Sequence, residues 1–223
     1  MVDTLIANHI LKNGLTFYMN KIMITLFILL GYSITWLEVF ASIVTLTSIA
    51  LLSRVNIWNW PLSIVGEILF MILFWKTGLF ANFVLQIYFL FISIYGWINW
   101  KKQGDNLKIK YLDKKHRWYL IPTMLILTPL LCYLNIFSAN PITDTTICVL
   151  SMVASYLMSK KIIDSWYLWI IVDILCIYLY YISGIYLISL EYVIITIMAI
   201  YGVMKWRNIE YSDSMSEINH QKI

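Results

Sequence analysis

TGLFANFVLQIYFLFISIYGWINWK at residues 77–101 and SGIYLISLEYVIITIMAIYGVMKWR at residues 183–207 are two copies of one pattern. At a shift of 106 residues (183 − 77), TGLF aligns with SGIY, IYG aligns with IYG, and each copy ends in a tryptophan followed by a basic residue. Chance produces one or two such matches, but not a register that holds without a gap. The chain is therefore built from an internal repeat, as many transporters are.

The repeat extends upstream through two more apolar stretches at the same shift. Each copy therefore holds three potential spans, over residues 36–103 and 142–209. A channel or an enzyme could share this plan, but transporters built from repeats bind their substrate where the repeats meet, near the midplane. The further aligned pairs are Glu38 with Asp144, Ser53-Arg54 with Ser159-Lys160, Trp60 with Trp166, and Glu67 with Asp173.

The composition requires lipid as the main solvent of this chain. Of its 223 residues 61% are hydrophobic and only 13% are charged, and the mean hydropathy is +0.77. A soluble domain of this size carries far more surface charge. An eighth apolar segment, at 17–34, fits either a further span or a helix lying in the membrane interface. The seven clear spans are predicted at 36–53, 58–75, 79–100, 117–136, 143–159, 166–182 and 185–206.

Positive charge predicts the orientation of these spans. The segment 101–117 carries seven Lys and Arg against two Asp, a net charge of +5 (7 − 2). Because basic loops stay in the cytoplasm, this segment and the C-terminus are expected there. Both repeats then end on the same side, so they are parallel and need one extra crossing between them, which the span at 117–136 supplies. The expected fold is an all-α membrane protein with a seven-helix core of 3 + 1 + 3 helices.

The remaining parts of the chain follow from this plan. Residues 1–35 form an N-terminal segment, and residues 104–141 form the basic loop and the linker helix. The polar tail 210–223 has no apolar period and is expected to be disordered in the cytoplasm. The three cysteines lie singly within apolar stretches, and the three histidines lie outside them. We therefore expect no disulfide, no metal, no cofactor, no catalytic residue and no nucleic-acid partner.

Aromatic and acidic side chains share one face of the second span in each repeat. Trp166, Trp169 and Asp173 are spaced i, i+3, i+7, and Trp60 and Glu67 hold the matching positions in the first repeat. Such faces can enclose a flat cationic ligand, through ring stacking, cation–π attraction and a carboxylate. The alternative is that the tryptophans are interfacial anchors and that the carboxylates bond to neighbouring helices.

Two amides lie on the third span of the first repeat. Asn82 and Gln86 are spaced i, i+4, and their side chains can both donate and accept hydrogen bonds. They suit the hydroxyls or the carboxamide of a ligand, but an interhelical polar clamp is the alternative. Glu191 has no comparable aromatic partner, and we assign it a packing role.

Four motifs resemble the PnuC family of bacterial vitamin transporters: NIWNWPL at 56–62, LQ at 85–86, YGWINW at 95–100 and KIIDSWYLWIIVD at 161–173. The resemblance covers the core from Trp36 to Trp206. It implies a SWEET-like fold, a homotrimer, and facilitated diffusion of nicotinamide riboside with trapping by a cytoplasmic kinase. It also places Trp166, Trp169 and Gln86 in the substrate site.

Other functions are open at this point. Relatives in the same superfamily carry thiamine, which is also a flat cation, or riboflavin, and Glu67 departs from the apolar or small residue expected at its position. An intramembrane enzyme would need a nucleophile or metal set that the spans lack. A binding subunit that depends on an ATPase would copurify with that partner.

Overall fold

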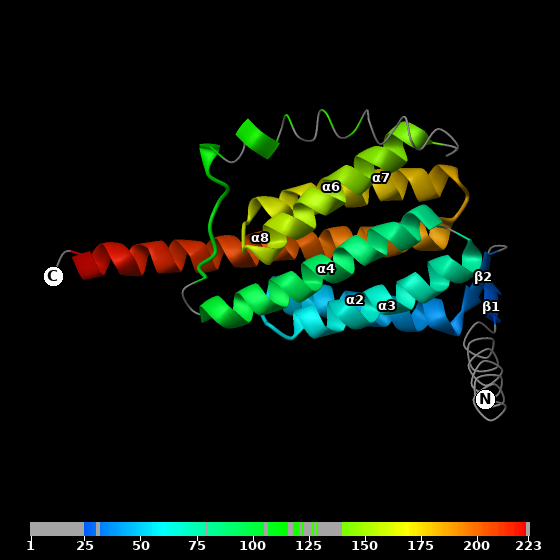
Figure 1. Cartoon of the computed structure of the whole chain (residues 1–223), viewed down its shortest axis with the longest axis horizontal. Helices are drawn as coiled ribbons and strands as arrows, with labels where there is room; N and C mark the ends of the chain where they lie inside the picture. The colour runs from blue at the N-terminus through cyan, green and yellow to red at the C-terminus, as the bar shows by residue number, and fades with distance from the viewer. Residues whose placement is uncertain are drawn as a thin grey trace, which may run out of the picture.

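The computed structural model describes residues 25–29, 32–78, 80–104, 107–115 and 140–221, with single positions between 118 and 128 (Figure 1). Within these residues, six helices are long and apolar enough to cross a membrane. The predicted all-α membrane fold is confirmed in this respect. The helices are α2 (Trp36–Ser53), α3 (Asn59–Thr77), α4 (Phe80–Gln103), α6 (Pro141–Ser159), α7 (Asp164–Ile182) and α8 (Tyr186–Gln221).

The two repeats have the same backbone at the predicted shift. The turn after α2 contains Val55 at φ 58°, and the turn after α6 contains its repeat equivalent Lys161 at φ 54°. The N–H groups of Val55 and Asn56 donate to the carbonyls of Leu52 and Leu51, at 2.9 and 3.0 Å. The equivalent distances after α6 are 3.0 and 3.1 Å. Both helices thus end in a Schellman motif, with a side chain held in the left-handed region that glycine usually occupies.

Residue chemistry explains where the other helices begin and end. Thr35 caps α2: its hydroxyl oxygen accepts from the backbone N–H of Glu38 at 3.2 Å, and the Glu38 carboxylate accepts from the Thr35 N–H at 2.7 Å. This is a capping box. Pro141 opens α6 at a position where its missing N–H costs nothing. Gly78, at φ 75°, ends α3 in the left-handed conformation.

The six helices form a closed ring. Around it, α2 packs on α3, α3 on α4, α4 on α6, α6 on α7, α7 on α8, and α8 again on α2. The first helix of each repeat therefore contacts the third helix of the other repeat. Each of these contacts joins the late part of the third helix to the last turn of the first helix. The repeats are thus parallel, related by a pseudo-twofold axis along the bundle (Figure 1).

One end of this bundle is basic, and we call it the basic end. There α2 and α6 end, and α4 and α8 carry the pairs Lys101-Lys102 and Lys205-Arg207. The crossing expected over 117–136 falls largely outside the described residues, so the single linker helix of the 3 + 1 + 3 plan stays a prediction.

The helix expected in the segment 17–34 is wrong for the part that the structure describes. β1 (Thr25–Leu29) and β2 (Tyr32–Thr35) pair as antiparallel strands. TLFIL and YSIT are rich in β-branched and aromatic residues, which favour a pleated strand over a helix. Residues 17–24 lie outside the described residues.

The disorder expected in the C-terminal tail is also wrong up to residue 221, because α8 continues as a helix to Gln221. In the first repeat, α4 stops where Gly104 adopts φ 50°. The equivalent residue in the second repeat is Glu210, and neither glycine nor proline follows it. The Ser214 hydroxyl donates to the Glu210 carboxylate at 3.2 Å, which supports one further turn. The extension projects beyond the bundle at its basic end (Figure 1).

Candidate functional site

Four tryptophans meet inside the ring at the basic end, and we call them the Trp quartet: Trp60, Trp100, Trp166 and Trp206. Trp60 lies edge-on to Trp100, with ring centroids 5.3 Å apart, and Trp166 lies edge-on to Trp206 at 5.6 Å. Trp100 and Trp206 meet each other at 6.3 Å. All four side chains are less than 5% exposed. The quartet therefore fills the space between the repeats at this end.

A glycine in each repeat makes room for the quartet. A Cβ atom at Gly96 would lie 2.5 Å from the Trp60 ring, and one at Gly202 would lie 2.7 Å from the Trp166 ring. Only glycine permits so close an approach between helix and ring. The glycine of each IYG motif therefore leaves the space that a tryptophan ring occupies. Trp60 and Trp166, predicted to contact a ligand through their rings, pack those rings against protein instead.

The indole N–H groups of the quartet fall into two kinds. Trp100 Nε1 donates to the Ser159 carbonyl of the second repeat at 3.1 Å, and Trp206 Nε1 donates to the Leu52 carbonyl of the first repeat at 3.2 Å. Trp60 Nε1 and Trp166 Nε1 are buried and have no hydrogen-bond partner among the described residues. Two tryptophans thus join the repeats, and the other two hold unsatisfied donors.

The two carboxylates lie two helical turns further into the bundle. On α3, Glu67 accepts a hydrogen bond of 2.6 Å from the Ser93 hydroxyl of α4. On α7, Asp173 is 1% exposed, and the residue equivalent to Ser93 is Ala199, which has no hydroxyl to donate. Glu67 Oε2 and Asp173 Oδ2 are buried without a partner among the described residues.

Trp169 lies where α7 reaches across to the first repeat. Its half-buried ring lies 6.3 Å from that of Phe89 on α4, at an angle of 46°. The equivalent position on α3 is Ser63, whose hydroxyl shares a hydrogen bond of 2.7 Å with Ser48. The second repeat thus offers an aromatic surface where the first repeat has a small polar contact.

The predicted amides do not join the Trp quartet. Asn82 is exposed near the start of α4, at the opposite end of that helix from Trp100, and Gln86 is half-buried one turn further along. The repeat equivalent of Gln86 is Tyr192 on α8, whose ring stacks on that of Tyr180 with centroids 5.5 Å apart.

Glu191 on α8 lies near Ser42 on α2, across the contact between the two repeats. Its packing role stays a prediction.

The sequence reasoning missed residues that the structure makes prominent: Trp100, Trp206, Gly96, Gly202 and Ser93. The first four stand in the repeated IYG and terminal-tryptophan motifs, so the signal was present in the alignment of the repeats. Among the described residues, no three of His, Cys, Asp and Glu come together as metal ligands.

The comparisons with known proteins agree with this architecture. The chain is 28% identical, over 221 residues, to the nicotinamide riboside transporter PnuC of Escherichia coli, covering 85% of this chain and 92% of that protein. It is 23% identical, over 199 residues, to the riboflavin/roseoflavin transporter RibM of Streptomyces davaonensis, covering 84% and 92% respectively.

A solved structure and a family model complete the comparison. The crystal structure of the vitamin B3 transporter PnuC matches with a TM-score of 0.65 at 21% identity, over 79% of this chain and 83% of that one. This match shows the same fold. The model of the family described as nicotinamide mononucleotide transporter matches residues 35–208, from the cap of α2 to two residues past Trp206. The chain is therefore a member of the nicotinamide mononucleotide transporter family, a multi-pass membrane protein.

Proposed function

We propose that this protein carries nicotinamide riboside into the cell by facilitated diffusion, for NAD biosynthesis. The observation that carries the proposal concerns four of the six buried side-chain polar atoms that have no partner among the described residues. The four are Trp60 Nε1, Trp166 Nε1, Glu67 Oε2 and Asp173 Oδ2. Buried polar groups are almost always satisfied by protein, water or ligand. Their repeat-related positions on α3 and α7 suit a polar molecule that passes between the repeats.

The chemistry of these groups fits a flat cation with polar substituents. Nicotinamide riboside carries a positively charged pyridinium ring, which Trp169 can stack on and Asp173 can neutralise. Gln86 and Asn82 are the candidates for the ribose hydroxyls or the carboxamide. Glu67, Trp60 and Trp166 would contact the ligand through their unsatisfied atoms rather than through their rings.

We propose the orientation in the membrane from the distribution of charge. The basic end is assigned to the cytoplasm of a bacterial inner membrane, with the C-terminus inside. A reporter protein that works only in the cytoplasm should be active when it is fused after Ile223. A homotrimer and functional coupling to a cytoplasmic kinase, which would trap the product, belong to the same proposal.

A second candidate substrate is riboflavin, because the relative RibM is a riboflavin/roseoflavin transporter. Thiamine, a flat cation, is the further alternative. Riboflavin is neutral at pH 7, so a requirement for the Asp173 carboxylate separates it from the two cations.

The test is uptake of labelled nicotinamide riboside into proteoliposomes that contain only this protein. We expect saturable uptake that unlabelled nicotinamide riboside blocks and that thiamine and riboflavin do not. The variant Trp169→Ala should lose uptake, while Trp97→Ala, which removes a more exposed tryptophan of α4 (38% exposed), should keep it. Absence of uptake, or inhibition by thiamine or riboflavin at equal concentration, would contradict the substrate assignment.

A further inference from the structure

The ring closes between the repeats along two seams that are held unequally. We call the contact of α4 with α6 and α7 the α4 seam, and the contact of α8 with α2 the α8 seam. In the α4 seam, the Tyr88 hydroxyl donates to the Met152 carbonyl at 2.8 Å. Asn99 Nδ2 and Trp100 Nε1 both donate to the Ser159 carbonyl, at 3.0 and 3.1 Å. This seam is bonded both at mid-helix and at the basic end.

A strap of residues 107–112 strengthens the α4 seam further. It follows α4 and lies against the turn between α6 and α7, where Lys110 pairs with Ile162 as a parallel β-bridge. Its Ile109 side chain is 6% exposed and packs in the same core cluster as the Trp quartet. The strap's hydrogen bonds are Lys110 N to Lys161 O at 3.2 Å, Ile163 N to Lys110 O at 2.9 Å, and Leu112 N to Asp164 Oδ2 at 2.7 Å.

In the part of the chain that the structure describes, no such strap crosses the α8 seam. The residues equivalent to the strap, 213–218, continue α8 as a helix that projects away from the bundle. Among the described residues, the hydrogen bond between α8 and α2 is that of Trp206 Nε1 with the Leu52 carbonyl, at 3.2 Å. At the basic end, therefore, a single indole closes this seam.

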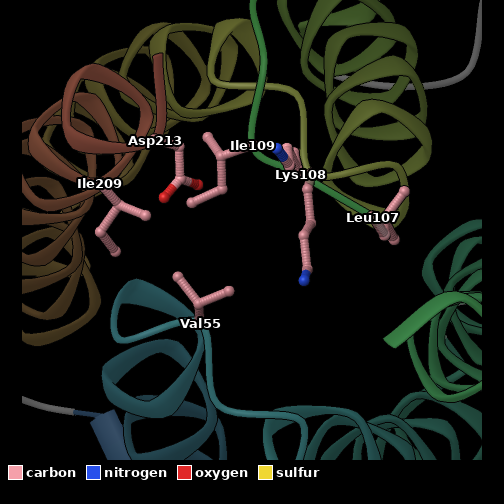
Figure 2. A pocket seen from close by; sticks show the side chains of 7 residues that line it. Val55, Leu107, Lys108, Ile109, Ile209 and Asp213 are labelled. Atoms are coloured by element: carbon pink, nitrogen blue, oxygen red, sulfur yellow. The ribbon is translucent and has the colours of Figure 1, made fainter. Parts of the chain in front are cut away.

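A groove of about 270 Å³ lies at the basic end, between the turns after α2 and α6, the strap and α8 (Figure 2); its lining residues are Val55, Leu107, Lys108, Ile109, Lys161, Ile209 and Asp213. Val55 lines it on one side, three residues beyond Leu52, and Ile209 lines it on the other, three residues beyond Trp206. Asp213 and Lys108 also border the groove, and Figure 2 shows both side chains directed toward its centre. The groove thus adjoins the α8 seam on one side, through Val55 and Ile209, and the strap on the other.

We infer that the transport path opens at the basic end between α2 and α8, into the groove bordered by Val55, Ile209 and Asp213, and that the α4 seam is the hinge. Interfaces with fewer hydrogen bonds open at lower free energy. Because the strap ties the first repeat to the second on one side only, separation of the repeats turns about that side. The inference rests on the proposed function only in that a small molecule must leave the ring at this end.

Two cysteine pairs test the hinge in proteoliposomes. The pair Val55→Cys with Ile209→Cys spans the groove, and the pair Lys110→Cys with Ile162→Cys spans the strapped seam at its β-bridge. Both pairs are introduced into a variant that lacks the three native cysteines and takes up substrate as the wild type does. Bridging by bifunctional thiol reagents is verified by mass spectrometry. We expect the 55–209 bridge to abolish uptake until a cleavable reagent is reduced, and the 110–162 bridge to leave uptake unchanged.

The opposite result, or inhibition by both bridges, would overturn the assignment of the hinge. Free uptake through both bridged pairs would show that the path does not leave the ring at this end, which also overturns the inference. If the unbridged protein shows no uptake, the substrate assignment fails, not the hinge. The extent of bridging, which needs no substrate, then tests the hinge. Reagents of short and long span should both bridge the 55–209 pair, and only the short ones should bridge 110–162. Equal bridging of the two pairs by long reagents would overturn the inference.

Discussion

The two repeats of this protein share a backbone but differ on the inner face of their second helices. Ser63 on α3 makes a small polar contact where α7 carries the indole of Trp169. Glu67 accepts from Ser93, whereas the carboxylate of Asp173 faces a position without a hydroxyl. An asymmetric substrate makes different contacts with the two repeats, and the side chains at these positions differ accordingly.

Other positions are equal in both repeats, and they are the ones that pack. The left-handed turns, the glycines beneath the tryptophan rings and the reciprocal indole bonds recur at the shift of 106 residues. The comparison teaches that symmetric positions build the ring and that asymmetric positions select what passes through it. Four sets of substitutions test this division.

The largest effect is expected where the symmetric core is emptied. Trp60→Ala and Trp166→Ala should each lower the free energy of unfolding by about 3–5 kcal/mol, because each leaves a large cavity in a packed core. Thermal unfolding of the purified protein in detergent measures this loss. Trp60→Phe and Trp166→Phe, which keep a ring, serve as controls. Tolerance of alanine in only one repeat would break the symmetry of the core.

The next effect is overpacking of the same core. Gly96→Ala and Gly202→Ala should each cost about 1–3 kcal/mol, since the added methyl meets a tryptophan ring. Gly78→Ala, at φ 75° with nothing near its Cβ, should cost about 1 kcal/mol through its backbone alone. The order of the melting temperatures checks this, and a Gly78 variant less stable than both others would contradict it.

The asymmetric carboxylates should affect transport more than stability. Asp173→Asn should reduce nicotinamide riboside uptake at low substrate by about tenfold, a loss of roughly 1.4 kcal/mol, because it removes the unpaired charge. Glu67→Gln should change uptake by less than about threefold, roughly 0.6 kcal/mol, since Ser93 already bonds that group. Initial rates in proteoliposomes measure both variants. Equal losses of uptake in the two variants would show that the carboxylates of both repeats interact with the charge of the substrate.

The smallest effect separates the two seams. Trp100→Phe and Trp206→Phe each remove one hydrogen bond, worth about 1 kcal/mol, and keep a ring. Both are made in the protein that carries Val55→Cys and Ile209→Cys. Trp100→Phe leaves Asn99 and the strap in place, so bridging of the cysteine pair should be unchanged. Trp206→Phe should increase bridging by long thiol reagents across that pair. An increase in the Trp100 variant alone would reverse the assignment of the seams.

Much of the fold was predictable because the repeat constrains both copies at once. The six apolar spans that lie in the two repeats, their order and their gapless register are borne out, since turn chemistry such as Gly78 and Gly184 marks the same points in each copy. The ends of the chain were predicted wrongly because they lie outside the repeat. There, strand-forming residues were read by hydropathy alone, and a polar helix without an apolar period was read as disorder.

The candidate site was only partly predictable. Helical spacing placed Trp166 and Asp173 on one face, but spacing does not say whether a ring meets a ligand or a glycine. That depends on Gly202, a residue 36 positions later (202 − 166) on another helix. The asymmetry of Glu67 and Asp173 could have been found by comparing Ser93 with Ala199 at the repeat shift. The linker, the trimer and the ligand contacts stay predictions.

The closure of the ring by α8 on α2 has a consequence for biogenesis. The first helix of the core finds its last neighbour 154 residues later in the chain, when nearly the whole protein has been synthesised. Until α8 inserts, one flank of α2 and one flank of α7 lack the neighbour that covers them in the ring. Membrane insertion of this protein therefore ends in a single late step, and a chain that stops before α8 should be a substrate for membrane proteases rather than a partly active carrier.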